Sequence, residues 1–294
     1  MPAPGLLYSP LLSECRIPHA FTTREGGVSA PPFDSLNFGN PMDLPPSQPR
    51  DPVENIRENF RRVLHEIGAA DREVTQVYQV HGGTAHVFRP GAPSRDRMPI
   101  SPPDRPSTEP APPGPDWEEL DFKADAIVTD DPSRVVAVRV ADCVPVLLAT
   151  EDGRLVAAVH AGWRGIVLNV TRAAVTAMRT LAAEHDARRD VVAAIGPCIG
   201  PSRFEVGPEV AGEFRRLFGD DRHALEHPDP DSARQGKVLI HLAAALKMQL
   251  NTLGITRIDT VPGCTASEPH RFFSHRREAG ITGRMVGLIG PRNP

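Results

Sequence analysis

The sequence has little cysteine and no long hydrophobic run. Its 294 residues include four cysteines, which lie far apart and form no CxxC pair. This pattern argues against a disulfide framework or a zinc ribbon and favours a reducing cytoplasm. No run of about 18 apolar residues occurs, so we expect no membrane-spanning helix. The N-terminus also lacks the basic start and the continuous apolar segment of a secretory signal.

Lysine is scarce as well, and the common nucleotide-binding motifs are absent. The 33 basic residues include only three lysines, which fits a general arginine bias better than phosphate recognition. The formal net charge of −4 gives no reason to expect nucleic-acid or membrane binding. Neither a P-loop nor a GxGxxG fingerprint occurs, which argues against a P-loop site and a Rossmann cofactor.

What is present is a central stretch, Val135 to Ile166, made of short apolar runs that end in reactive residues. Runs rich in Val and Leu and bounded by Gly and Asp are typical of buried strands. We predict that residues 144–159 form a hairpin that turns at Asp152-Gly153. Such a hairpin would bring Cys143, before its first strand, close to His160, after its second.

A thiolate beside an imidazole has two common uses in proteins. The two groups form a Cys–His nucleophile pair, or they are two ligands of a metal such as zinc. A third interpretation is that Cys143 packs as a small hydrophobe and that His160 ends its strand in a satisfied hydrogen bond. His81 follows another predicted strand and precedes two glycines, where the backbone can approach a ligand or simply turn. The residues alone leave these alternatives open.

The rest of the chain shows no repeat and no clear second domain. Asp51 is expected to cap a helix that has Pro52 in its first turn and ends at Gly68. A helix of about 18 residues should follow Gly165. Two more helices are predicted over residues 208–218 and 238–253. Strands are predicted over 74–80, 84–88, 125–129, 191–195, 255–261 and 285–289.

A proline-rich segment over residues 90–116 interrupts this pattern. It holds ten prolines between Pro90 and Pro115 and has no apolar periodicity. Such a segment cannot offset its ordering entropy by burial. We therefore expect a surface insertion, and we favour it over a lid above the site.

Two glycine-rich turns follow predicted strands. In the first, Gly162 to Gly165, free backbone N–H groups at a helix start would be able to hold an anion. Arg164 would add a fixed positive group there. The second turn, Gly196 to Gly200, contains Cys198, for which we favour a structural role.

Five motifs stand in order along the chain: QVHG at 79–82, ADCVP at 141–145, HAGWRG at 160–165, IGPCIG at 195–200, and FFSHRR with TGR near the C-terminus. This set resembles the laccase-domain (YfiH-like) family, which is also labelled polyphenol oxidase or purine nucleoside phosphorylase family. The resemblance extends from Phe21 to Gly290. It implies an α/β fold with a single catalytic domain over residues 1–294, in which packed mixed β-sheets are flanked by helices.

The resemblance also implies a zinc-dependent enzyme that acts on purine nucleosides. Its metal ligands, which are also its catalytic residues, correspond here to His81, Cys143 and His160. The implied activities are phosphorolysis of adenosine, inosine and methylthioadenosine, and deamination of adenosine. Three protein ligands leave a fourth zinc position open, which is the pattern of a catalytic site.

Phosphorolysis requires an anion site that holds phosphate against the sugar C1′ atom. The candidates for contacts to phosphate or nucleoside are Arg164, Arg276, Arg277, Arg284, Gln79, Ser35 and Asn37. The sequence also departs from the family pattern. His275 stands where the family more often has Tyr, the segment after Gly39 matches poorly, and the proline-rich segment is longer than expected. Because of these departures, the resemblance does not define which nucleoside is preferred.

Three other functions compete with this interpretation. Copper-dependent phenol oxidation follows from the older family label, but none of the 11 histidines forms a paired HxH array. A metal-free hydrolase would use Cys143 and His160 as a nucleophile pair. A non-enzymatic zinc protein is disfavoured, because structural zinc usually has four protein ligands.

Overall fold

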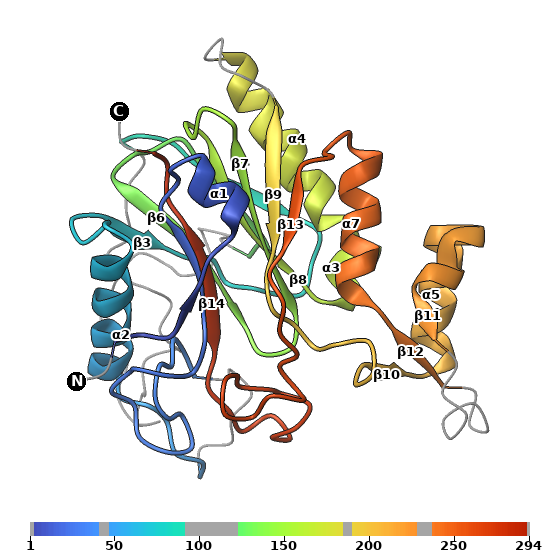
Figure 1. Ribbon diagram of the computed structural model, residues 1–294, viewed down its shortest axis with the longest axis horizontal. Coiled ribbons are helices and arrows are strands. Elements are labelled where there is room, and N and C mark those ends of the chain that lie inside the picture. The colour runs from blue at the N-terminus through green and yellow to red at the C-terminus, as the bar shows by residue number, and fades with distance from the viewer. Residues whose placement is uncertain (1–2, 41–46, 92–122, 185–189, 228–236, 293–294) are drawn as a thin grey trace, which may run out of the picture.

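Two β-sheets pack face to face in the computed structural model, and helices cover both outer faces (Figure 1). The structure describes residues 3–40, 47–91, 123–184, 190–227 and 237–292. The first sheet has five strands, in the order β1 (Leu6–Leu7), β2 (His19–Thr22), β14 (Met285–Ile289), β6 (Arg134–Val140) and β3 (Glu73–Thr75). The α/β fold with mixed sheets, which the sequence predicted, is confirmed.

The second sheet has six strands and carries the central stretch of the sequence. Its order is β13 (Ile258–Thr260), β9 (Val191–Ile195), β7 (Val144–Thr150), β8 (Val156–Ala161), β5 (Ala126–Thr129) and β4 (Ala85–Phe88). The strands β7 and β8 form the predicted antiparallel hairpin. His160 lies within β8 rather than after it, so the second strand is longer than predicted.

Successive side chains of each strand point to opposite faces of the sheet, so the hydrophobic core consists of separate layers. Val136 and Val138 of β6 pack between the two sheets against Leu147 of β7. The residues of β6 that point the other way, such as Val135, pack against helix α2 (Val53–Glu66). On the far side, the six-stranded sheet packs against α4 (Val170–Glu184) and α7 (Leu242–Thr252). Figure 1 shows these helices on opposite sides of the paired sheets.

A small third sheet extends from one side of this body. It consists of β10 (Glu205–Val206), β12 (Val238–Ile240) and β11 (Glu226–His227), and it lies beside helix α5 (Pro208–Phe218), as Figure 1 shows at the right. A 3-10 turn, Gly219–Ala224, follows α5. The other helices in the described ranges are the short α1 (Pro10–Glu14) and α3 (Trp163–Val167).

Several predicted elements differ from the observed ones, among them the strand predicted over 255–261, which is limited to β13. The helix expected after Gly165 is divided into α3 and α4, because Asn169 has a positive φ of 57° that an α-helix does not tolerate. The helix expected over 238–253 begins as strand β12, because these residues pair with β10 and β11. Such long-range pairing overrides the local periodicity.

The strand predicted over residues 74–80 ends at Thr75. Beyond it the side chain of Gln79, not its backbone, exchanges hydrogen bonds with the backbone of Arg139, so the ladder stops. Asp51 does not cap α2. Its carboxylate accepts hydrogen bonds from Ser29, Asn37 and Asn55, and Pro52 stands at the N-cap.

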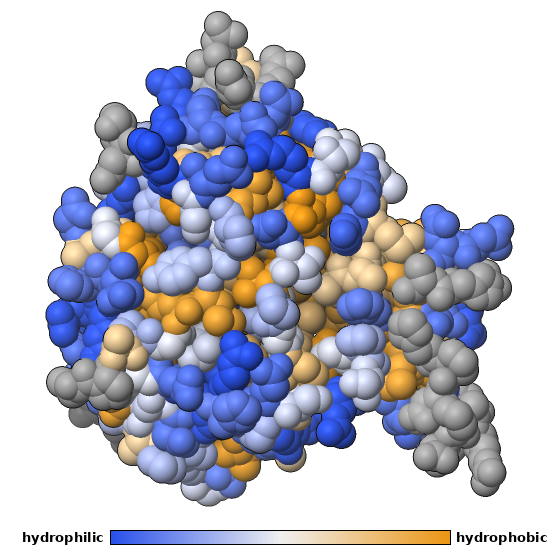
Figure 2. All heavy atoms as spheres, in the orientation of Figure 1, coloured by the Kyte–Doolittle hydropathy of each residue, from blue (hydrophilic) through white to orange (hydrophobic). Residues whose placement is uncertain are grey.

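Hydrophobic residues reach the surface in separate patches among hydrophilic ones on the face shown in Figure 2. No helix in the described ranges is long and apolar enough to cross a membrane. Most of the proline-rich segment lies outside the described residues, which resume at Lys123.

Candidate metal centre

The hairpin of β7 and β8 carries two of the predicted site residues. Pro145 pairs with His160 and Val144 with Ala161, so Cys143 and His160 lie at the same edge of the six-stranded sheet. His81 reaches this edge from the loop between β3 and β4. Its backbone has a positive φ of 57°, a conformation that is uncommon for a residue other than glycine.

These three side chains converge on one point. One ligand atom from each of His81, Cys143 and His160 lies within 4.8 Å of the others. The two imidazole rings approach edge to face, with their centroids 4.9 Å apart. His160 is buried, Cys143 is half-buried and His81 is exposed, so the group opens to solvent on the His81 side.

Gly162 leaves the space that the three side chains occupy. A Cβ atom added there would lie 2.9 Å from the Cys143 sulfur and 3.3 Å from the His81 ring. A larger residue would therefore push two of the three side chains apart. Close packing against the site therefore requires a glycine at position 162 of the HAGWRG motif.

Asp125 connects the two histidines. It is fully buried, and its Oδ1 atom accepts a hydrogen bond of 2.8 Å from Nδ1 of His160. The same carboxylate accepts backbone hydrogen bonds from Val80, His81 and Gly82. Burial would raise the pKa of Asp125, but these bonds and the charge of His160 hold it below its ordinary value.

The two histidines also change the acidity of Cys143. Burial would raise the pKa of its thiol, but the charge of His160 and hydrogen bonds from both imidazoles outweigh burial and lower it to about 6. The thiolate and Asp125 in turn raise the pKa of His160 to about 9 against the effect of burial. The site therefore favours a thiolate at neutral pH, which is the form that binds metals and attacks electrophiles.

The donor set fits a metal ion of borderline softness. One thiolate and two imidazoles are common ligands of zinc and of other late first-row metals. Within the described ranges, this is the group in which three or more such donors come together. The exposed His81 side leaves room for a further ligand, as a catalytic metal site requires.

Hydrogen bonds connect a C-terminal loop to Asp142, the residue before Cys143. Asp142 has a positive φ of 90°, and its carboxylate accepts hydrogen bonds from Thr265 (2.6 Å) and from the backbone of Arg276 (2.7 Å). Its carbonyl accepts a third from Ile199. Three segments distant in sequence therefore hold the backbone conformation that directs Cys143.

The four candidate arginines are not equally available to a substrate. The side chain of Arg277 donates to two backbone carbonyls and to Glu278, and that of Arg276 donates to the carbonyl of Glu205. Arg284 donates to its neighbouring carbonyls. Arg164 stacks over Trp163 at 4.4 Å, and within the described residues its guanidinium has no hydrogen-bond or ion-pair partner. The helix that follows, α3, has five residues and offers little helix dipole.

The three polar candidates make contacts within the protein. Gln79 holds the backbone of Arg139, and Ser35 binds the backbone of Gly27 and Arg24. Asn37 is fully buried and binds Asp51 and the backbone of Arg284. These side chains hold the loops near the C-terminal segment and the QVHG motif.

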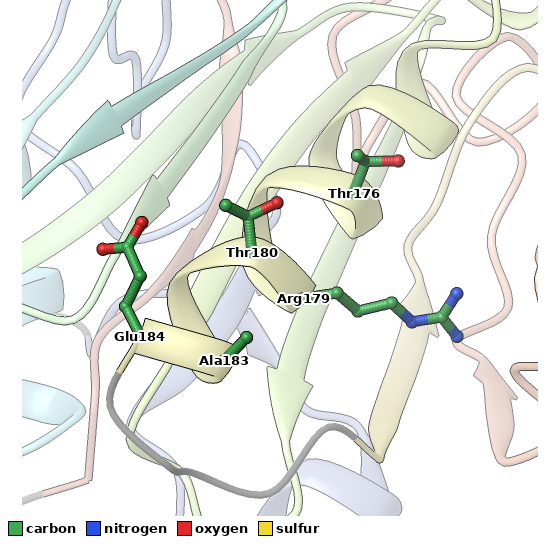
Figure 3. Close-up of a pocket in the computed structure, with 5 residues that line it drawn as sticks. All are labelled: Thr176, Arg179, Thr180, Ala183 and Glu184. Atoms are coloured by element: carbon green, nitrogen blue, oxygen red, sulfur yellow. The ribbon is translucent and has the colours of Figure 1, made fainter.

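A shallow surface depression lies elsewhere, along the outer side of α4. Its lining comes entirely from this helix: Thr176, Arg179, Thr180, Ala183 and Glu184 (Figure 3). The lining contains no cysteine or histidine. The depression therefore offers none of the chemistry of the three-residue group.

Sequence reasoning missed two residues of the site, Asp125 and Gly162. Asp125 is an acidic residue that directly precedes the apolar strand β5, and an acidic residue in that position is the sequence feature that points to a special role. No local signal shows that its carboxylate meets a histidine 35 residues further on.

Comparison with known proteins connects this site to a family. Residues 18–292 match the family described as multi-copper polyphenol oxidoreductase laccase. A protein of Deinococcus radiodurans named purine nucleoside phosphorylase is 33% identical over 293 residues, covering 99% of this chain and 95% of its own. The Escherichia coli protein named purine nucleoside phosphorylase YfiH is 32% identical over 269 residues, covering 91% of both chains.

Solved structures show the same fold. YlmD from Geobacillus stearothermophilus superimposes with a TM-score of 0.77 at 28% identity, covering 100% of this chain and 98% of its own. The hypothetical protein YfiH of Bacillus licheniformis gives a TM-score of 0.76 at 27% identity, covering 98% and 97%.

Proposed function

The chain belongs to the multi-copper polyphenol oxidoreductase laccase family, and from this premise we propose that it is a zinc-dependent purine nucleoside phosphorylase with adenosine deaminase activity. The names of its relatives support the first activity. The observation that carries the proposal is the convergence of His81, Cys143 and His160 at an edge open on one side. Its substrates would be adenosine, inosine and methylthioadenosine, in the cytoplasm.

The chemistry that zinc supplies at such a site is Lewis acidity, which makes hydroxide available near neutral pH for attack at the purine C6 atom. His81, Cys143 and His160 would hold the ion. The half-buried edge would exclude bulk water from one side of the substrate. The exposed side of His81 would admit the nucleoside.

Phosphorolysis places a separate demand on the chain. An oxygen of phosphate attacks the sugar C1′ atom, the bond from C1′ to the base nitrogen breaks, and the base leaves with a proton. We infer that Arg164 is the principal phosphate ligand, because its guanidinium has no polar partner in the described part of the chain. Arg276, Arg277 and Arg284 would act mainly through the loop that they hold.

The nucleoside would lie against the segments that carry Ser35, Asn37 and Gln79. Since these side chains already bind backbone or buried groups, we infer that they shape the nucleoside site through those segments. A direct contact would require Gln79 to release Arg139.

The test combines products, metal and one substitution. Zinc-loaded protein incubated with adenosine and phosphate should yield adenine and ribose-1-phosphate, together with some inosine, as measured by chromatography. Omission of phosphate should stop adenine formation and spare inosine formation. Cys143→Ala should lower both activities by at least about 100-fold, whereas Cys15→Ala should retain them. The absence of turnover with zinc bound, or full activity in Cys143→Ala, would reject the proposal.

A second candidate, a metal-free hydrolase, is supported by one specific observation. His160 lies between the Cys143 thiol and the Asp125 carboxylate, as the imidazole does in a nucleophile–His–acid triad. Activity that survives complete removal of metal by a chelator would favour this candidate. Copper oxidation would be favoured by tightly bound copper and robust phenol turnover.

A further inference from the structure

Asp125 occupies a position from which it can control both histidines of the metal centre. We propose that Asp125 is a positioning residue: its carboxylate fixes the proton of His160 on Nδ1 and holds the His81 loop in its left-handed conformation. The inference rests on the metal centre of the proposed function and adds the group that sets its geometry. Asp125 itself is not one of the three residues that would hold the ion, and it acts through the two histidines.

The contacts use the whole carboxylate. The Oδ1 atom accepts from His160 Nδ1 at 2.8 Å and from the backbone N–H of His81 at 3.0 Å. The Oδ2 atom accepts from the backbone N–H groups of Gly82 at 2.5 Å and of Val80 at 3.2 Å. Asp125 is fully buried, so no water competes for these positions.

The first consequence concerns the tautomer of His160. An ionised carboxylate only accepts hydrogen bonds, so the ring nitrogen that faces it must carry the proton. The proton of neutral His160 therefore lies on Nδ1, and the lone pair of Nε2 is directed away from Asp125. Metal-bound histidines in proteins generally have such a partner, which orients the ring and increases its basicity.

The second consequence concerns the His81 loop. Three consecutive backbone N–H groups, those of Val80, His81 and Gly82, point at one carboxylate and form an anion-binding turn. This turn offsets the cost of the positive φ at His81, which is about 1–3 kcal/mol for such residues. Without the carboxylate, three N–H groups would lose their acceptor and the His81 ring would lose its direction.

The sheet fixes the distance between Asp125 and its partners. Asp125 stands immediately before β5, and β5 pairs with β8 from Ala126 opposite Val159. The backbone N–H of His160 also donates to the carbonyl of Asp125 at 2.7 Å. The carboxylate is therefore held on the same rigid ladder as His160, and only the His81 loop depends on it for its position.

Asp125→Asn is the decisive variant, because it keeps the size and removes one acceptor. An amide has one oxygen and one NH2 group, so in either orientation the NH2 group faces His160 Nδ1–H or the backbone N–H groups. We expect zinc affinity to fall by about 10- to 100-fold, as for other partners of metal ligands. Zinc alone is the probe, measured by competition with a chromogenic chelator and by metal content after dialysis.

Asp131→Asn is the matched control. Asp131 is also a buried carboxylate with hydrogen bonds to Ser133 and Arg134, but it binds no residue of the metal centre. Its zinc affinity should equal that of the wild type, even if thermal stability falls in both variants. A measurement on the wild-type protein covers the case in which Asp125→Asn does not fold: with zinc bound, nitrogen NMR of His160 should show protonated Nδ1 and unprotonated Nε2.

Zinc affinity of Asp125→Asn within twofold of the wild type, or a His160 proton on Nε2 in the zinc-bound wild type, would overturn the inference. A wild-type protein that binds zinc but cleaves no nucleoside would reject the proposed function and leave the role of Asp125 standing. A wild-type protein that binds no zinc would reject both.

Discussion

Two cysteines at the same edge of the six-stranded sheet, Cys143 and Cys198, have opposite electrostatic environments. Cys143 precedes β7 and Cys198 follows β9, and these two strands run antiparallel with Val146 opposite Ile195. The pKa of the Cys143 thiol is lowered to about 6. Burial raises the pKa of the Cys198 thiol to about 12, with smaller contributions from Cys264, Cys143 and Asp142.

The difference between the two thiols shows what makes a cysteine functional in this fold. Burial disfavours the thiolate at both positions, so it does not distinguish them. The distinguishing feature is the pair of imidazoles, which the β7–β8 hairpin and the His81 loop bring to Cys143 alone. The structural role that the sequence favoured for Cys198 agrees with its environment.

The largest expected difference is in alkylation by iodoacetamide in metal-free protein. At pH 7 the fraction present as thiolate is roughly 10⁵ times higher for Cys143 than for Cys198. Because a more acidic thiolate is a weaker nucleophile, the expected ratio of the two alkylation rates is about 100-fold. The Cys143 rate should rise through a midpoint near pH 6 and level off above pH 7, because the thiolate accumulates as pH rises through the pKa. Peptide mass spectrometry assigns each site. Equal alkylation rates at Cys143 and Cys198 would contradict the difference in acidity between the two thiols.

A smaller effect is expected from Gly162→Ala, which adds a methyl group 2.9 Å from the Cys143 sulfur. The overpacking should cost about 1–3 kcal/mol of stability in chemical denaturation. It should also weaken zinc binding about 10-fold by separating Cys143 from His81.

Gly212→Ala is the control for that variant. Gly212 lies in helix α5, and an added Cβ atom would have no neighbour within 4 Å. This change should raise stability by about 0.4–1 kcal/mol and leave zinc binding unchanged. If both alanine variants bound zinc equally, close packing at Gly162 would have no role in the site.

The smallest effect is expected from Cys198→Ala. Removing a buried sulfur should cost about 1 kcal/mol of stability, in the range for a small core truncation. Zinc affinity should not change, because Cys198 donates no ligand to the group. A loss of zinc as large as that of Cys143→Ala would mean that the two thiols share one site.

Local sequence patterns defined several elements that have a clear run of apolar residues or a clear turn signal. Strand β14 and helix α5 begin and end where their apolar residues predicted, and the hairpin from Val144 follows from its turn residues. The convergence of His81 with Cys143 and His160 followed only from the family resemblance, since nothing local joins these segments.

Long-range contacts account for what the sequence did not disclose. Val238 has helical periodicity with the residues that follow it, yet it pairs with Val206 in a separate sheet. Asn169 interrupts a helix that its neighbours would continue. Asp125 resembles a strand-end residue until its contact with His160 is known.

The position of the β7–β8 hairpin between two hydrophobic layers has a consequence for ion selection. Val146 and Leu147 of β7 face opposite cores, and every residue of both strands is buried. A shift of either strand along its axis would disrupt the packing of both hydrophobic layers. The distance between the sulfur of Cys143 and the ring of His160 is therefore fixed. An ion that binds must fit this fixed distance, and His81 on the surface loop is the ligand that can move to match the radius of the ion.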